Sequence, residues 1–319
     1  MGCIAILAGD GPVRVISAKE AHDYGGPGFV WLHADSFEEV DLAALLGEGD
    51  IPEVAGSALM AMETRPRCDR IGDGALVNLR GIGAVQPDSG DELVSLRMWV
   101  RQGKVNSVSR MPLLASAAVV EQMKAGRIHD PGDLVAAFAR EISVQMDPFV
   151  AELGDTLDDC EAALEDRHEL YKMRSSIAKI RTAAITYRRF VAPDRDALAT
   201  LASLEFDWIA VDDRLHIREA ADRFARMAEE LEAIRERSAL LHEQLTDLRS
   251  EQIDQRSLYI SIIAFIFLPL TFITGLLGMN VEGIPYAHSP WSFWGVVIFC
   301  VVVGVTVTGW FMGRHWLRR

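Results

Sequence analysis

One set of residues near the C-terminus has the chemistry to handle an ion: the tripeptide Gly278-Met279-Asn280 and the positions that precede it at alternating steps of three and four. On a helix, such spacing places side chains on one face. Because small and hydroxyl residues favour a bundle interior over lipid, this face is either a packing seam between two helices or the wall of an ion pathway. Counted backward from the tripeptide, its members are Gly275, Thr271, Leu268, Ala264, Ser261, Ser257, Asp254, Ser250, Asp247 and Glu243.

The elements that carry this face are predicted to cross a membrane. Two stretches, Ser257 to Val281 and Gly283 to Gly313, contain no Asp, Glu, Lys or Arg. Spans at 258–277 and 293–312 would each measure roughly 30 Å at about 1.5 Å per helical residue, which matches the hydrocarbon core of a bilayer. We therefore expect two transmembrane helices, of which the first carries the face.

Flanking charges set the orientation of the two spans. Arg249 and Arg256 precede the first, a basic tail (313–319) follows the second, and the loop between them (278–292) has neither Lys nor Arg. Since positive charge gathers on the cytoplasmic side, both termini are expected in the cytoplasm. The N-terminal apolar stretch is short, lacks the basic start of a signal peptide and fits a strand equally well.

A long helix is predicted to lead into the first span. It begins near Asp213, forms a stalk over 213–257 and carries a heptad seam in which apolar residues and one serine alternate at three and four: Phe224, Met227, Leu231, Ile234, Ser238, Leu241, Leu245 and Leu248. Such a helix needs neighbours along its length, and symmetric self-association is an economical source of them. The pattern leaves open whether the seam pairs within one chain or between chains.

Upstream of the stalk, the chain changes from sheet to helix. Residues 1–130 alternate short apolar runs, among them 29–33 and 75–80, with turn residues and short helical segments, which predicts an α/β domain. Residues 131–212 form a helical region. There we expect Pro148 to interrupt a helix that starts at Pro131, a long helix from Phe149 to Phe190, and a restart at Asp194.

Composition excludes several classes of function. A formal charge of −14 disfavours nucleic acid as a partner and favours the attraction of cations. The four cysteines are scattered without metal-ligand spacing, so we predict no structural metal site. With no nucleophile motif, phosphate-binding loop or ligand cluster, the chain is predicted not to be an enzyme and to need no cofactor.

Several motifs resemble one known family. Glu63-Thr64-Arg65-Pro66-Arg67-Cys68 leads into Leu79-Arg80-Gly81, and Met146-Asp147-Pro148, 187–193 and 267–272 follow, with the tripeptide closing the first span. Together they resemble the CorA superfamily of divalent-cation transporters, and more narrowly its ZntB branch, over essentially the whole chain. The resemblance implies a funnel-shaped homopentamer in the cell inner membrane, whose first membrane helix lines the pore and whose second surrounds it.

The resemblance also implies roles for individual residues. At the outer mouth, five Asn280 carbonyls would accept hydrogen bonds from the water shell of an incoming ion, while Gly278 permits the turn that ends the helix and Met279 packs. Thr271 and Ser261 would supply hydroxyl rings and Leu268 an apolar ring that gates by excluding water. Ser257, Ala264 and Gly275 would complete the lining, and Asp254, Asp247 and Glu243 would form a cytoplasmic acidic ring, although such a run is equally typical of a solvated helix face.

Zinc is the cargo that the ZntB resemblance implies, taken up with proton coupling; cobalt, nickel, cadmium and magnesium are further candidates. The stretch from Ser257 to Val281 has no Asp, Glu, His, Lys, Arg or Cys, so any proton site must lie at its ends: Glu282 and His288 outside, Asp254 inside. Two alternatives stay open. One is a magnesium or cobalt channel driven by membrane potential, and the other a membrane-tethered scaffold or sensor without a pore.

Overall fold

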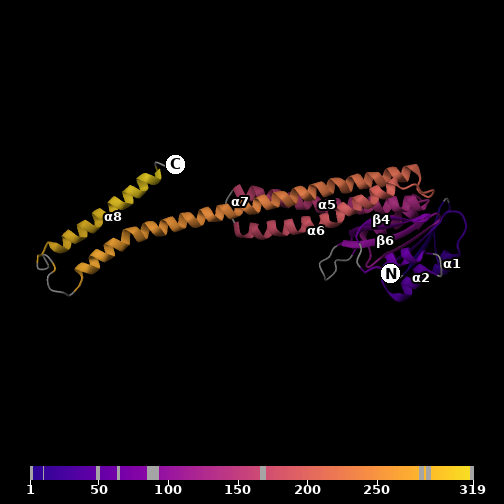
Figure 1. Ribbon diagram of the computed structural model, residues 1–319, viewed down its shortest axis with the longest axis horizontal. Coiled ribbons are helices and arrows are strands. Elements are labelled where there is room, and N and C mark those ends of the chain that lie inside the picture. Colours follow the sequence, from indigo (N-terminus) through magenta and orange to yellow (C-terminus); the bar gives the residue numbers. More distant parts are fainter. Residues whose placement is uncertain are drawn as a thin grey trace. The chain divides into compact units, whose positions relative to one another are not determined.

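The computed structural model describes residues 3–9, 11–47, 51–62, 65–84, 93–165, 170–279, 284 and 289–316. The chain divides into two compact units, Met1–His242 and Glu243–Arg319 (Figure 1). Helix α7 (Val211–Leu277) contributes its first half to one unit and its second half to the other. Its start agrees with the helix predicted from about Asp213.

A mixed sheet forms the base of the first unit, with strand order β2-β1-β3-β7-β6-β5-β4. Only the β3–β7 pair is parallel among the described strands; the others are antiparallel. The runs at 29–33 and 75–80 are strands as predicted, and Gly103, at φ 72°, closes the turn between β6 and β7. The strands are β1 (Ile4–Ala8), β2 (Arg14–Ile16), β3 (Phe29–Ala34), β4 (Arg67–Ile71), β5 (Gly74–Ile82), β6 (Leu93–Arg101) and β7 (Lys104–Ser109).

Short helices cover one face of this sheet and long helices the other. Helices α1 (Ala18–Asp23), α2 (Glu39–Leu46) and α3 (Glu53–Met60) bury residues such as Leu45 and Leu59 against Leu32 and Trp99. On the opposite face lie α4 (Leu114–Lys124), α5 (Pro131–Glu165) and α6 (Leu170–Ser203). There Phe138 of α5 packs edge-on against Trp31, with ring centroids 5.6 Å apart. The predicted α/β domain is thereby confirmed.

The helix boundaries predicted at the two prolines are wrong. Helix α5 continues through Pro148 and is described to Glu165, and α6 is described from Leu170 and continues through Pro193. Proline removes one backbone hydrogen bond and crowds the carbonyl four residues earlier. At Pro148 this cost is limited because Pro148 and Val144 are both exposed, so water can reach the freed carbonyl. Buried Met146 and Val150 hold the helix on either side.

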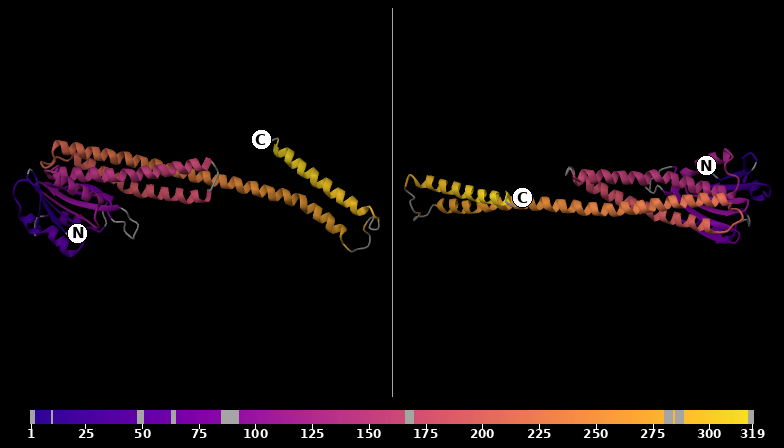
Figure 2. Two further views of the ribbon diagram at one scale, coloured as in Figure 1. Left: turned by 180° about the vertical axis from the view of Figure 1, so that it is seen from behind. Right: turned by 90° about the horizontal axis from the view of Figure 1, so that it is seen from above.

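The heptad seam of α7 is buried within one chain. Its members from Phe224 to Leu245 are at most 5% exposed, and α5 and α6 run alongside this part of α7 in both views of Figure 2. Ion pairs join the three helices at the margins of the seam. Arg237 of α7 binds Glu161 of α5 through two nitrogen–oxygen contacts of 3.1 and 2.7 Å, and Arg188 of α6 lies 2.9 Å from Glu232 of α7. The open question about the seam is answered in favour of pairing within the chain.

Apolar helices make up the second unit. The end of α7 and α8 (Ser292–Trp316) are each long and apolar enough to cross a membrane, at the places where the two spans are predicted. Large apolar side chains along both, such as Phe267, Leu268 and Trp294, are more than half exposed. Surfaces of this kind need lipid or neighbouring helices to cover them.

Candidate functional site

Burial within the first unit shows which face of α7 is not covered by α5 and α6; we call it the free face. Glu229, Ala233, Glu236 and Leu240 are exposed, and they alternate with the buried seam residues on the opposite side of the helix. Continued at the same spacing of three and four, this free face runs into Glu243, Asp247, Ser250 and Asp254. The side of α7 that is turned away from α5 and α6 is therefore the face singled out in the sequence. Glu236 and Glu229 were not predicted as part of it, although the same count carried about four turns further back from Glu243 would have included both.

In the membrane-spanning part of α7, the face is helical and exposed throughout: Ser257, Ser261, Ala264, Leu268, Thr271 and Gly275. The Ser261 hydroxyl donates a hydrogen bond to the Ser257 carbonyl, with an oxygen–oxygen distance of 2.8 Å. Because this bond uses the hydroxyl proton, the lone pairs of Ser261 Oγ are left to accept from outside the helix. An acceptor of this kind suits water molecules around a cation, whose hydrogens point outward.

The tripeptide begins where α7 ends. The Gly278 N–H donates to the Thr274 carbonyl at 2.9 Å, just beyond the last helical residue, Leu277. Gly278 is not among the glycines with positive φ, so the chain leaves the helix here without the left-handed conformation that favours glycine. A Cβ at this position would lie 3.0 Å from the Thr274 oxygen, and this close approach favours glycine instead. Met279 is 47% exposed. Asn280, Glu282 and His288 lie outside the described residues.

Two of the motifs singled out in the sequence meet in the first unit, where they have a structural role. The Arg80 guanidinium lies 3.8 Å from the centre of the Phe190 ring, and the Arg80 backbone N–H donates to Asp194 Oδ1 at 3.0 Å. Burial raises the pKa of the Asp194 carboxyl well above its usual value, although the Arg80 hydrogen bond and charge act in the opposite direction. These contacts connect α6 to the part of β5 that extends past its pairing with β4. Arg80, Phe190 and Asp194 therefore have a shared structural role.

A second group of polar residues lies at the N-termini of α5 and α7. Carboxylate oxygens of Asp130, Asp133 and Asp213 lie within 4.8 Å of one another. Each of them also serves as a helix cap. Asp130 accepts from the Asp133 N–H at 2.9 Å, Asp133 from the His129 N–H at 2.9 Å, and Asp213 from the Ala210 N–H at 2.7 Å. The cluster was not predicted, because Asp213 is distant in the sequence from Asp130 and Asp133 and nothing in the spacing marks it as their neighbour.

We expect Asp213 to make stability depend on pH. Burial raises its pKa from 3.8 to about 7; the hydrogen bond from the Ala210 N–H acts in the opposite direction, and the nearby charges of Asp130 and Asp133 add to the increase. The folded chain therefore keeps a proton that the unfolded chain releases near pH 4, so this contribution to stability is complete below that pH and is lost as the pH rises to about 7. Thermal unfolding of the full-length protein in detergent should occur at a lower temperature at pH 8 than at pH 5.

The matched variant is Asp213→Asn, whose amide oxygen can still accept from the Ala210 N–H but which cannot titrate. It should unfold with a smaller difference between the two pH values than the unaltered chain. An unchanged difference would show that another group is responsible.

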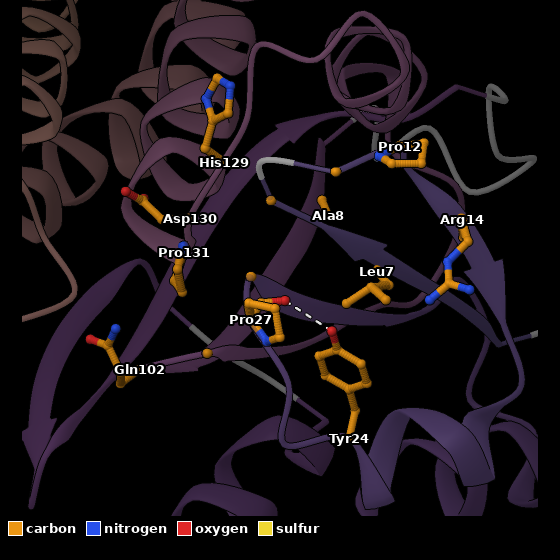
Figure 3. A pocket seen from close by; sticks show the side chains of 14 residues that line it. Leu7, Ala8, Pro12, Arg14, Tyr24, Pro27, Gln102, His129, Asp130 and Pro131 are labelled. Atoms are coloured by element: carbon orange, nitrogen blue, oxygen red, sulfur yellow. Dashed lines mark hydrogen bonds between the residues drawn. The ribbon is translucent and has the colours of Figure 1, made fainter.

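Beside this cluster is a pocket of about 540 Å³ (Figure 3). Its wall includes backbone that approaches closely at Gly9 and Gly28; a Cβ on Gly28 would lie 2.3 Å from the Ala8 oxygen. Tyr24 donates to the Pro27 carbonyl at 2.9 Å. The polar side chains of Arg14, Gln102 and His129 point to different parts of the rim and do not converge on one ligand position. The free face of α7 is therefore the stronger candidate for a functional site.

Known proteins match the chain over nearly its whole length. A family model described as CorA-like Mg²⁺ transporter protein matches residues 26–319. The zinc transport protein ZntB of Pectobacterium carotovorum subsp. carotovorum is 30% identical over 98% of this chain and 94% of its own length. The full-length CmaX protein has a structure with a TM-score of 0.78 and 30% identity, covering 99% of this chain and 97% of that one. The CorA magnesium transporter from Methanocaldococcus jannaschii shares the fold at a TM-score of 0.80 and 17% identity, covering 98% of both chains.

Proposed function

The chain belongs to the family of CorA-like Mg²⁺ transporter proteins, and from this membership we propose that it transports divalent metal cations, zinc foremost, across the cell inner membrane. One observation carries the proposal beyond the family: the face of α7 left free by α5 and α6 changes from acidic to hydroxyl and small residues as the helix becomes apolar. Relatives named as zinc transport proteins support zinc as the cargo. In this proposal no catalytic step and no cofactor is needed.

The transporting unit is a funnel-shaped homopentamer with both termini in the cytoplasm. In it, five copies of α7 turn their free faces toward a common axis and α8 surrounds them. Five times the formal charge of −14 gives −70, enough to enrich cations near the cytoplasmic mouth. The acidic side chains of Asp254, Asp247 and Glu243 face this mouth, and the free face extends the acidic path to Glu236 and Glu229.

Inside the membrane, the ion meets neutral groups only. Thr271 and Ser261 offer hydroxyl oxygens, Leu268 forms an apolar constriction, and the tripeptide from Gly278 to Asn280 stands at the outer mouth. Zinc prefers thiolate and imidazole ligands, and the face has neither. The ion therefore crosses with most of its water shell, and the pore selects it by charge and hydrated size.

Proton coupling, if it uses side chains, is confined to the two mouths. Glu282 and His288 outside and Asp254 inside are the titratable positions nearest to the neutral face. Coupling distinguishes a zinc importer from a magnesium or cobalt channel that is driven by membrane potential alone.

Flux into liposomes separates these possibilities. With the membrane potential clamped, zinc uptake should rise severalfold when protons are more concentrated on the side from which zinc enters. Zinc flux that is independent of the proton gradient but increases with the membrane potential would favour a channel driven by membrane potential. If correctly assembled protein carries neither zinc, cobalt nor magnesium, the chain is a scaffold and the proposal fails.

A further inference from the structure

Helix α5 carries an acidic strip with no basic partner. Glu152, Asp155 and Asp159 follow one another at steps of three and four and are all exposed. Their neighbours Asp158 and Glu161, on another side of the helix, are bound by Arg237 of α7. In the described part of the chain, the three carboxylates of the strip make no ion pair. The strip therefore points away from α7 and carries three uncompensated negative charges.

A basic strip lies on α6, on the side that approaches α7. Arg174 and Arg181 are exposed, and seven residues further along the same face Arg188 lies against Glu232. Arg235 of α7 also contacts Glu232 and, at 4.0 Å, its neighbour Glu236, so the two arginines there meet two carboxylates. Among the residues described, neither Arg174 nor Arg181 has an ion-pair partner. These two arginines therefore carry the uncompensated positive charge of the strip.

The two strips lie at the same level along the bundle. The acidic residues come six to thirteen positions before the end of α5, and Arg174 and Arg181 come four to eleven positions after the start of α6. At about 1.5 Å per residue, these are roughly 9 to 20 Å and 6 to 17 Å from the connection between the two helices. They cannot neutralise each other within one chain, because the α6 strip faces toward α7 and the α5 strip away from it.

We propose that the acidic strip of α5 in one copy of this chain docks against the basic strip of α6 in the next copy. If the copies are related by rotation about an axis parallel to the helices, each residue keeps the same height along that axis in every copy. The acidic strip of one copy and the basic strip of the next, which lie at the same height, can therefore meet in each pair of neighbouring copies. Two different complementary surfaces make a heterologous contact, which closes into a ring when the rotation allows it. The proposal rests on the proposed assembly of identical copies and names a surface that holds them together.

Charge reversal tests the contact in the full-length protein in detergent. One variant carries Glu152→Lys, Asp155→Lys and Asp159→Lys, and a second carries Arg174→Glu and Arg181→Glu. Each should dissociate at a lower temperature than the unaltered assembly in low salt, and the difference should shrink in high salt because exposed charges are screened. Combining both sets restores opposite charges across the contact and should recover most of the lost stability. A combined variant no more stable than the weaker of the two would overturn the proposal.

Disulfide trapping provides a readout that does not depend on stability. Two differently tagged chains are produced together, one with Asp155→Cys and the other with Arg181→Cys, and oxidation should join the two tags. The matched control replaces Arg181→Cys with Ala199→Cys, an exposed position farther along α6, and should give little product. Equal yields from both pairs would contradict the contact. Zinc flux is measured separately, since loss of flux with normal trapping would count against the transport proposal alone.

Discussion

Replacing Asn280 with alanine should lower divalent-cation flux by roughly tenfold or more while leaving the assembly intact. The expectation is motivated by the position of Gly278-Met279-Asn280 directly after the last helical residue of α7, Leu277. If five copies surround the outer mouth, Asn280→Ala removes five amide oxygens that accept hydrogen bonds from the water shell of the ion. No other polar side chain lies between Thr274 and Asn280, so none on the helix side of Asn280 replaces them.

Flux is measured with an indicator dye inside liposomes, at equal amounts of correctly assembled protein. Met279→Leu is the matched control, because it alters the neighbouring residue without removing an oxygen, and it should transport at close to the normal rate. Asn280→Asp should instead bind the ion more tightly and release it more slowly, since a carboxylate replaces a neutral carbonyl. If Asn280→Ala transports like the unaltered chain, the tripeptide does not belong to the ion pathway.

The elements of the fold were predictable wherever one local pattern dominates. Period-two runs located β3 and β5, and the uncharged stretches located both spans. The helix ends predicted at the prolines were wrong, because buried residues on both sides of Pro148 keep α5 helical despite the lost hydrogen bond. The heptad seam was recognised, but its partner was not, since a pattern of buried positions does not say which surface covers them.

The candidate site shows a similar limit. The face from Glu243 to Gly275 followed from spacing alone, whereas its extension to Glu236 and Glu229 needed the burial of the opposite side of α7. The carboxylate cluster of Asp130, Asp133 and Asp213 depends on two helix starts meeting in space. Its members are up to 83 positions apart, and no spacing rule operates over that distance.

Reversing the charge of Asp254 should block cation flux more strongly than a similar change elsewhere on the same helix. Asp254 is the last acidic residue on the free face before the neutral membrane segment. In a pentamer, Asp254→Lys would replace five negative charges by five positive ones in a narrow ring, where repulsion of a divalent ion is least screened by water. We expect a loss of flux of roughly a hundredfold, against a severalfold loss for Asp254→Asn, which removes attraction without adding repulsion.

Glu251→Lys is the matched control, since it makes the same change in net charge three residues earlier, roughly 60° around the helix from Asp254. It leaves the Asp254 ring in place and should cost only a small part of the flux. Equal losses from Asp254→Lys and Glu251→Lys would mean that the overall negative charge of the funnel governs entry. A loss confined to position 254 would instead place a ring of carboxylates on the path of the ion, and it would fix the register in which the free face of α7 meets the axis.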